Sequence, residues 1–372
     1  MLVGVPKEIK DSEFRVGLVP SMVRELTANG HHVLVEQNAG LGAGLTDADY
    51  QAAGAKIVTD ADAVFAEAEL IVKVKEPLAV ERKKLRRGQV LFTYLHLAAD
   101  PVQAAELMAS GAICIAYETV TSPEGALPLL TPMSEVAGRM APQAGARCLE
   151  KENGGRGVLL GGVPGVSPAD VVVIGGGVAG SHAALISVGM GATVTVVDRN
   201  PEALRRIARE LGARVRTVFS TRDAIETLCR RADLVIGSVL IPGAAAPKLI
   251  TAETVKAMKP GAVIVDIAID QGGCAETSRP TSHSAPTYLV DEVVHYCVTN
   301  MPGAVSRTST FALNNVTLPF VLALADNGYR RALGQDEHLR RGLNVHEGKI
   351  THRAVAGALK LDFTPPEVAL RL

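Results

Sequence analysis

The chain has 372 residues, of which 47% are hydrophobic and 21% are charged, and its formal net charge is −1. This length predicts two domains with a large buried core, and the near-neutral charge gives no reason to expect a nucleic acid or an anionic membrane as a partner. Aromatic residues make up only 3% and Trp is absent, which argues against stacking platforms for single-stranded nucleic acids.

Cysteine usage and the N-terminal segment indicate the compartment. The cysteines are scattered, odd in number and form no C-x-x-C pair: Cys114, Cys148, Cys229, Cys274 and Cys297. This pattern is typical of reduced thiols in a cytosolic protein. The N-terminal segment becomes charged at Lys7 and does not resemble a signal peptide, and no apolar run approaches the roughly 18 residues that span a bilayer. We therefore expect a cytoplasmic protein without a membrane partner.

The first third of the chain alternates short apolar runs with helical patterns. Strands are predicted at residues 2–5, 33–36, 56–58, 70–74, 90–94 and 113–116. Helices are predicted at residues 21–29 and 47–53, from residue 60, before Gly88, and at residues 101–110. This β-α-β-α order predicts a parallel sheet that is covered by helices on both faces.

A looser region separates this part from the next. Residues 134–151 have helical spacing, with Ser134 as the expected N-cap. Pro142 lies inside this segment, and a proline in a helix interior removes a hydrogen bond, so we expect a kink or a break there. Residues 153–168 are rich in glycine and proline and are predicted to form a loop.

Residues 171–198 are the most informative stretch. A buried strand is followed by three glycines in G-x-G-x-x-G spacing, a helical segment, a second strand and an acid; the glycines are Gly175, Gly177 and Gly180, and the acid is Asp198. The glycines allow a tight turn, a close approach to a pyrophosphate and close helix packing, while the helix N-terminus attracts phosphate. A glycine turn in an ordinary βαβ unit is the alternative, but here every part of the dinucleotide motif is in place.

The residue at the end of the second strand bears on the choice of cofactor. Asp198 can accept hydrogen bonds from the adenosine ribose, and its charge would repel a 2′-phosphate, which favours NAD. Arg199 follows directly and could accommodate that phosphate, so NADP stays a less favoured alternative.

The second half continues as one complete dinucleotide fold. Helices are predicted at residues 201–211, 222–231 and 251–258, and strands at residues 215–219, 233–240, 262–269, 287–290 and 295–298. Beyond Pro302, residues 310–326 are helical and contain Pro319, and residues 339–361 carry short helix and turn signals. We expect this tail to fold back on the first domain, because no strand-rich domain is left for it to form.

These elements predict an α/β protein with two doubly wound domains. A Rossmann NAD-binding domain at residues 129–305 is expected to be inserted in a discontinuous catalytic domain at residues 1–128 and 306–372, with a cleft between them. Ligands of open α/β sheets bind beyond the carboxyl ends of the strands. Four residues suited to acid–base or carboxylate chemistry follow predicted strands: Arg15, Lys75, His96 and Asp270.

Each of these four residues also has a structural interpretation, which the sequence leaves open. The alternatives are a loop contact for His96, a surface pair with Glu76 or Glu8 for Lys75, a solvated pair with Glu13 for Arg15, and a cap of the Gly272–Gly273 turn for Asp270.

Several segments together resemble one known family over nearly the whole chain. The segments are GVPKEIKDSEFRVGLVP, VKVKEP, LFTYLHLA, TPMSEVAGRMA, VVVIGGGVAG, VDIAIDQGG and TNMPGAVSRTSTFALNN. They resemble the alanine dehydrogenase family, which includes the nucleotide-binding region of proton-translocating nicotinamide nucleotide transhydrogenase. The resemblance implies NAD-dependent, reversible oxidative deamination of L-alanine to pyruvate and ammonium, and a homohexamer.

The resemblance also implies roles for individual residues. Arg15 and Lys75 match the substrate-binding residues, and His96 and Asp270 match the proton-transfer residues. The expected cofactor contacts, with the three glycines, are Ser134, Gly175, Gly177, Gly180, Asp198, Ser220, Val239, Leu240, Ile267, Asp270, Arg279, Val298, Asn300 and Met301. The chain departs from the family at Ala203, where a lysine near the adenosine ribose is frequent. It also has Ala323 and Asn327 in the late helix, where some members are described with an acid and a histidine that bind a metal, so no metal site is expected.

Three other functions stay open. A soluble transhydrogenase subunit would need no acid–base pair for amine chemistry, so the joint presence of Lys75, His96 and Asp270 disfavours it. A related amino-acid dehydrogenase of the saccharopine-forming type would take a larger substrate. A protein that senses NAD without turnover would not need the polar residues at the strand ends.

Overall fold

The computed structural model describes residues 1–239 and 246–372. The chain divides into two compact units: Met1–Met133 with Val305–Leu372 form the first, and Ser134–Ala304 form the second. The division differs slightly from the predicted domain bounds, because residues 129–133 and Val305 belong to the first unit. Leu240, an expected cofactor contact, lies outside the described residues.

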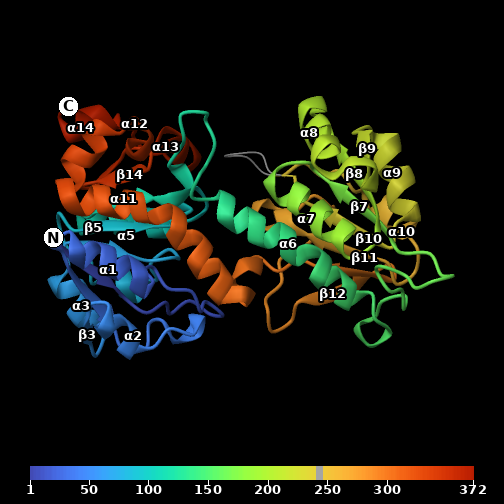
Figure 1. The fold of residues 1–372 in the computed structure, drawn as a ribbon. Coiled ribbons are helices and arrows are strands. Elements are labelled where there is room, and N and C mark those ends of the chain that lie inside the picture. The colour runs from blue at the N-terminus through green and yellow to red at the C-terminus, as the bar shows by residue number, and fades with distance from the viewer. Residues whose placement is uncertain (240–245) are drawn as a thin grey trace. The chain divides into compact units, whose positions relative to one another are not determined.

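The first unit is built on an eight-stranded sheet in the order β15-β14-β6-β5-β4-β1-β2-β3 (Figure 1). Its strands are β1 Leu2–Val5, β2 His32–Glu36, β3 Lys56–Val58, β4 Leu70–Val72, β5 Val90–Thr93, β6 Ile113–Ala116, β14 Leu343–His346 and β15 Lys349–Ile350. Its helices are α1 Pro20–Ala28, α2 Asp47–Ala52, α3 Ala61–Glu67, α4 Ala79–Arg82, α5 Pro101–Ser110, α11 Ser306–Gln335, α12 Glu337–Arg340, α13 Arg353–Leu359 and α14 Pro366–Leu370.

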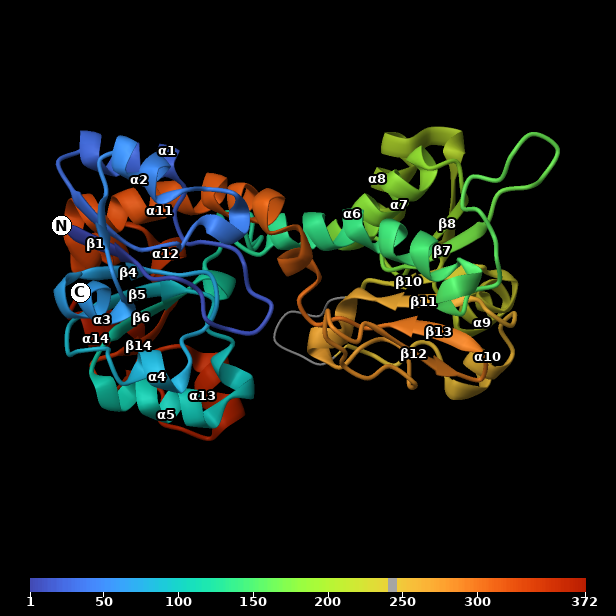
Figure 2. The ribbon, with the colours of Figure 1, turned by 90° about the horizontal axis from the view of Figure 1, so that it is seen from below.

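The first sheet has helices on both faces. Strands β1 to β6 pair in parallel. In Figure 2, α1, α2 and α11 lie on one face and α4, α5 and α13 on the other. The parallel α/β architecture that the sequence predicts is therefore confirmed for this unit.

The C-terminal tail completes this sheet with two strands that the sequence pattern did not indicate. Strand β14 pairs antiparallel with β6, and β15 pairs antiparallel with β14. Val345 and Ile350 are fully buried in the same core as Cys114. Such short strands carry little periodicity and form because tertiary pairing and burial stabilise them.

The long helix α11 corrects one expectation about membranes. Among the described residues, the helical stretch Met301–Gln335 has the length and composition to cross a membrane, with a mean hydropathy of 1.3 over an 18-residue window. Its Asn314 is nevertheless fully buried; the side chain accepts from the Val19 N–H at 2.8 Å and donates to the Val16 carbonyl at 3.3 Å. A buried side chain with hydrogen bonds to a neighbouring segment is typical of a helix in a protein core.

The second unit contains a seven-stranded sheet in the order β12-β13-β11-β10-β7-β8-β9. Its strands are β7 Asp170–Ile174, β8 Thr193–Asp198, β9 Val215–Phe219, β10 Leu234–Gly237, β11 Val263–Asp266, β12 Thr287–Val290 and β13 Val293–Tyr296. Its helices are α7 Val178–Gly189, α8 Pro201–Leu211, α9 Arg222–Arg231 and α10 Ala252–Lys256, together with most of α6 Thr131–Cys148. Only the edge strand β12 is antiparallel to its neighbour.

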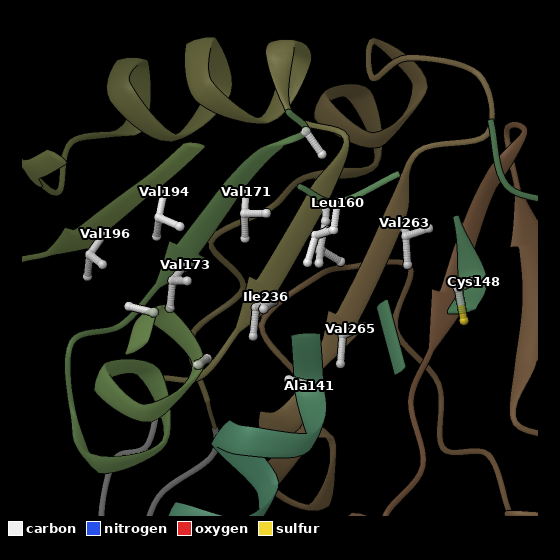
Figure 3. Close-up of a cluster of buried hydrophobic side chains, with 14 of the residues drawn as sticks. Ala141, Cys148, Leu160, Val171, Val173, Val194, Val196, Ile236, Val263 and Val265 are labelled. Carbon is white, nitrogen blue, oxygen red and sulfur yellow. The ribbon is translucent and has the colours of Figure 1, made fainter. Parts of the chain in front are cut away.

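The central strands β7, β10 and β11 of this sheet are buried on both faces, which explains their continuous apolar sequences. Val171 and Val173 pack in one core with residues of α6 to α8 (Figure 3). Val172 and Ile174 pack in a second core with residues of α9 and α10. Alternate residues of a strand point to opposite faces, so a strand covered on both sides has no polar positions.

Two predicted boundaries and one predicted break in this unit were wrong. Helix α6 begins at Thr131, so Ser134 lies inside the helix and does not cap it. Pro142 does not split α6, because residues on both sides of it pack in one core. Strand β11 ends at Asp266 and is followed by a short 3-10 helix, Ile267–Gln271, so the apolar run at residues 262–269 exceeds the strand.

The two sheets share one strand order. Read from the edge, β3-β2-β1-β4-β5-β6 in the first unit matches β9-β8-β7-β10-β11-β13 in the second. The order reverses between β1 and β4, and between β7 and β10. In open α/β sheets ligands bind at such a switch point, beyond the carboxyl ends of the strands, so each unit has one position of this kind.

Candidate active site

The glycine turn lies at the switch point of the second unit. Gly175 has a φ of +102°, which disfavours side chains, and a Cβ on Gly180 would lie 1.8 Å from the Gly175 carbonyl oxygen. A Cβ on Gly177 would meet nothing within 4 Å. Ser238, just past β10, donates to the carbonyls of Ile174 and Gly175 at 3.0 Å. The turn is therefore tightly held, and the Cα of Gly177 borders open space.

Asp198 ties the end of β8 to this turn. Its carboxylate accepts the backbone N–H of Gly176 and, at 2.7 Å, that of Asn200. A hollow of about 480 Å³ is lined by Asp198, Gly177 and Arg206, among others. These features fit a dinucleotide, because amides at a helix start suit a pyrophosphate and an acid beside a hollow suits a ribose.

Arg206 contacts the glycine turn directly. The sequence pattern pointed to Arg199 and gave no role to Arg206. Its guanidinium donates to the Gly176 carbonyl at 2.7 Å, whereas Arg199 is exposed. Its position on α8 gave no local signal, because an arginine on an amphipathic helix is usually a solvated residue.

Most of the expected cofactor contacts follow strands of this sheet. Because the carboxyl ends of parallel strands share one edge, the structure brings these residues together there: Gly175, Gly177 and Gly180 after β7, Asp198 at the end of β8, Ser220 after β9, Val239 after β10, Ile267 and Asp270 after β11, and Val298, Asn300 and Met301 after β13. Two of the expected cofactor contacts do not directly follow a strand of this sheet. Ser134 is in α6, and Arg279 stacks on the ring of Tyr288 with its guanidinium carbon 4.3 Å from the ring centroid.

Asp270 lies in the short 3-10 helix after β11, with an exposed side chain. The N–H groups of Gly272 and Gly273 donate to the backbone carbonyls of Ile269 and Ala268, so backbone bonds hold that turn. The loop is held by Asp266, which is fully buried and accepts from Cys274 N at 2.8 Å and Ser278 Oγ at 2.6 Å. The sequence analysis missed Asp266.

Arg15 follows β1 in the first unit, beyond the carboxyl end of that strand, and is buried against Glu13. Its Nε and Nη2 donate to the two carboxylate oxygens of Glu13 at 2.7 and 2.6 Å. The side chains are 2% and 0% exposed, so the pair is not the solvated one that the sequence left open. A buried carboxylate fixes the plane of the guanidinium, which a flexible surface pair would not do.

Lys75 follows β4 and has an ammonium of perturbed proton affinity. Burial lowers the pKa of Lys75 below that of an ordinary lysine; the charge of Glu76 opposes the shift, and the charge of Arg15 adds to it. Glu76 is 4.0 Å away and also pairs with Lys10. Glu8 accepts the backbone N–H of Lys75 at 3.3 Å and does not pair with its ammonium within 4 Å.

His96 follows β5 in a left-handed backbone conformation, with a φ of +50°. Its N–H donates to Glu118 at 2.6 Å, and its ring stacks on Tyr94 with centroids 5.8 Å apart. A non-glycine residue persists in this conformation only where its surroundings hold it, and such residues cluster at functional sites. The side chain itself is exposed.

Arg15, Lys75 and His96 therefore come together within the first unit. They follow β1, β4 and β5, which are neighbours in the sheet. A Cβ on Gly17 would lie 2.4 Å from the Val72 carbonyl oxygen, so the loop that carries Arg15 passes directly over the end of β4. The arrangement offers two cations and a histidine, a set suited to an α-keto or α-amino acid.

Three carboxylates support these residues: Glu8 and Glu13, which are buried, and the half-buried Glu118. The sequence named Glu8 and Glu13 only as surface partners and gave no signal for Glu118, because burial and its partners are set by distant segments. Among the described residues, no group of three or more His, Cys, Asp or Glu side chains could hold a metal ion. All five cysteines are buried and free.

Comparison with known proteins identifies the relatives of the chain. The family model described as "Alanine dehydrogenase/PNT, N-terminal domain" matches residues 4–137, and "Alanine dehydrogenase/PNT, C-terminal domain" matches residues 141–353. An alanine dehydrogenase from Halomonas elongata is 60% identical over 363 residues, which is 98% of each chain.

Solved structures give the same neighbourhood. A structure of an L-alanine dehydrogenase is similar with a TM-score of 0.94 and 53% identity, over 97% of this chain and 99% of the other. A transhydrogenase from Sinorhizobium meliloti is similar with a TM-score of 0.82 at 26% identity, over 95% of this chain and 100% of the other.

The glycine turn allows a direct test of cofactor binding. We expect Gly180→Ala to weaken NADH binding at least about tenfold, or about 1.4 kcal/mol, because the new Cβ would collide with the Gly175 carbonyl and distort the turn. Gly189→Ala is the matched control in the same helix, where a Cβ meets nothing within 4 Å. Titration of NADH fluorescence measures both, and equal affinities in the two variants would contradict the assignment.

Proposed function

The chain belongs to the alanine dehydrogenase/PNT family, and from this premise we propose which of its residues carry out the reaction. It is an NAD-dependent amino-acid dehydrogenase that converts L-alanine reversibly to pyruvate and ammonium. The resemblance that the sequence motifs indicated is confirmed. The observation that carries the site assignment is the placement of Arg15, Lys75 and His96 beyond three neighbouring strands.

Arg15 and Lys75 are proposed to bind the substrate. Arg15 holds the substrate carboxylate with a planar guanidinium whose orientation Glu13 fixes. Lys75 donates a hydrogen bond to the oxygen of the pyruvate carbonyl, and its positive charge polarises that bond. The burial that lowers the pKa of Lys75 also leaves its charge only weakly solvated, which strengthens its effect on the substrate.

His96 and Asp270 are proposed to move protons. Bound NAD would supply the hydride acceptor for the Cα–H of alanine, so that the substrate is oxidised to an imine. Water must then add to the imine carbon, and the carbinolamine must lose ammonia. A histidine, whose unperturbed pKa is about 6.5, can both take and give the protons of these steps near neutral pH. Asp270 positions or deprotonates the water.

The residues that hold NAD are proposed to be those at the edge of the second sheet. The amides of the glycine turn bind the pyrophosphate, and Asp198 accepts hydrogen bonds from the adenosine ribose. The carboxylate of Asp198 would meet a 2′-phosphate with like charge, which supports NAD over NADP. Arg206 holds the carbonyl of Gly176 and so keeps the amide side of the turn toward the cofactor.

A soluble transhydrogenase subunit is the alternative of a different class. The Sinorhizobium meliloti transhydrogenase shares the fold at 26% identity, less than half of the 60% shared with the Halomonas elongata alanine dehydrogenase. Hydride exchange between nucleotides needs no carboxylate clamp and no proton-transfer pair. The buried pair of Arg15 with Glu13 therefore favours the dehydrogenase.

Assembly and location follow from the family resemblance, the cysteines and the charge of the chain. We propose a homohexamer, supported by the family resemblance, and a cytoplasmic location, supported by five free cysteines. We propose no membrane partner, supported by the formal net charge of −1. Sedimentation velocity of the purified protein measures the assembly. We expect a single species near six times the 38.9 kDa chain mass, and a stable monomer or dimer would contradict the hexamer.

The activity and the two proton-transfer residues can be tested together. We expect NADH formation from L-alanine at alkaline pH, with at least about a hundredfold loss of kcat in His96→Ala and in Asp270→Asn, since general acid–base catalysis contributes about 10²–10⁴-fold. Absorbance of NADH measures turnover, and NADH binding should persist in both variants. Turnover that survives His96→Ala would remove the proposed mechanism. Tight NADH binding without any turnover of alanine would favour the transhydrogenase subunit.

The protonation of Lys75 leads to a separate prediction. Because burial lowers the pKa of Lys75 below 10.5, kcat/KM for pyruvate should fall as pH rises, with a midpoint below that of an ordinary lysine. Lys75→Arg keeps its charge to above pH 12, so this alkaline limb should disappear even if the rate is lower. The profile is measured at a constant concentration of free ammonia. An unchanged limb in Lys75→Arg would assign the titration to another group.

A further inference from the structure

The switch point of the first sheet contains a buried ionic cluster in the position where the second sheet has its glycine turn. Lys73 follows β4, and its Nζ lies 3.0 Å from Glu8 and 2.7 Å from Glu81. The Lys73 side chain is 0% exposed, and the two carboxylates are 2% and 3% exposed. We call these three residues the Lys73 cluster. It joins the loop after β1, the end of β4 and the first turn of α4.

The Lys73 cluster also holds the backbone of the segment that carries Lys75. Glu8 accepts the Val74 N–H at 2.6 Å and the Lys75 N–H at 3.3 Å. From the other side, the Thr93 hydroxyl on β5 donates to the Lys75 carbonyl at 2.9 Å. The residue proposed to polarise the substrate carbonyl is thus anchored at both of its backbone polar groups.

Glu81 extends this anchoring along the segment. Its second oxygen accepts the Leu78 N–H at 2.8 Å, so the two carboxylates of the cluster bind successive parts of the same loop. Lys73 lies between them and pairs with both, which fixes the rotamers of Glu8 and Glu81. The Lys75 side chain is only 16% exposed, so its packing restricts the four-carbon stem and the position of the backbone largely decides where the ammonium lies.

The electrostatics of the cluster argue against a purely stabilising role. Two carboxylates and one ammonium are removed from water, and burial raises the pKa of Glu8 although Lys73 and the Val74 N–H oppose the shift. Buried ion clusters are often no more stable than well-packed apolar residues of similar volume. What such a cluster supplies is a defined geometry, because each charge has few acceptable positions.

We propose that Glu8 is a positioning residue for Lys75, and that Lys73 and Glu81 serve to hold Glu8 in place. The inference rests on the proposed function, in which the Lys75 ammonium polarises the substrate carbonyl. Glu8 acts on that ammonium through the backbone of residues 74 and 75 and does not contact the substrate. In this unit the switch point therefore positions a catalytic side chain, whereas in the other unit it presents amides to a nucleotide.

Glu8→Gln tests the inference, because it keeps the shape of the side chain and removes the charge that bonds the two amides and Lys73. We expect kcat/KM for pyruvate to fall about 10- to 100-fold, since displacement of a catalytic group by about 1 Å can cost about 100-fold. The affinity for NADH should change less than about twofold, because the glycine turn lies in the other unit. In a Lys75→Ala background, Glu8→Gln should cause no further loss.

Asp233→Asn is the matched control. Asp233 is a buried carboxylate that accepts the Asp170 N–H at 2.8 Å and pairs with Arg156 at 2.7 Å and Lys259 at 2.9 Å. It precedes β10, at the opposite end of the strand from the switch point. We expect Asp233→Asn to lower the melting temperature and to leave kcat/KM unchanged. A similar loss of kcat/KM in both variants would show that destabilisation alone explains the effect, and would overturn the inference.

The outcomes separate the inference from the function on which it rests. If Lys75→Ala leaves kcat/KM unchanged, the proposed role of Lys75 fails and the inference fails with it. If Lys75→Ala is impaired and Glu8→Gln reduces its activity further by the full factor, Lys75 keeps its role and the positioning by Glu8 is overturned. If Glu8→Gln does not fold, Glu81→Gln replaces it, since it weakens the Lys73 pairing that holds Glu8 while the Glu8 side chain itself is unchanged; a loss that disappears in the Lys75→Ala background supports the inference, and no loss, or a loss that persists there, overturns it.

Discussion

The site depends on carboxylates that accept backbone N–H groups where strands end. In the first unit Glu8 binds the amides of residues 74 and 75, and Glu118 binds the amide of His96. In the second unit Asp198 binds the amide of Gly176, and Asp266 closes the loop that carries Asp270. A hydrogen bond to an ionised acceptor is about twice as strong as a neutral one and has a narrower geometry. These bonds turn loops, which are usually mobile, into fixed supports for the proposed functional residues.

The two units show how one architecture supports different chemistry. Both sheets have the same strand order and the same switch point. In the second unit the switch point carries a glycine turn, and a Cβ on Gly177 would meet open space. In the first unit the switch point is filled by charged side chains: Glu8 binds the amides of Val74 and Lys75, and Lys73 neutralises part of its charge. An open glycine turn suits an anionic cofactor, whereas a switch point filled by side chains can position a reactive group, so the site and not the fold decides the function.

The accuracy of the sequence analysis varied with the range of the interactions involved. Strands β1 to β6 and the glycine turn were predicted well, because an apolar run between turn residues and the G-x-G-x-x-G spacing are local signals. Strand β14 was missed, since pairing with β6 from more than 200 residues away stabilises it. The start of α6 was misplaced because Ser134 has the character of an N-cap, yet the helix continues through it.

The residues of the candidate site also divide into those with a local sequence signal and those placed by long-range contacts. Sequence alone determined the two α/β sheets, the dinucleotide motif with Asp198, and the choice of Arg15, Lys75, His96 and Asp270, because strand ends and motif spacing are written locally in the chain. Only the tertiary structure decided that Lys73 is buried in an ion cluster while Lys75, two residues later, stays partly accessible. It also revealed Glu8, Glu118 and Asp266 as supports. Burial and hydrogen-bond partners arise from segments distant in the chain, and no local pattern encodes them.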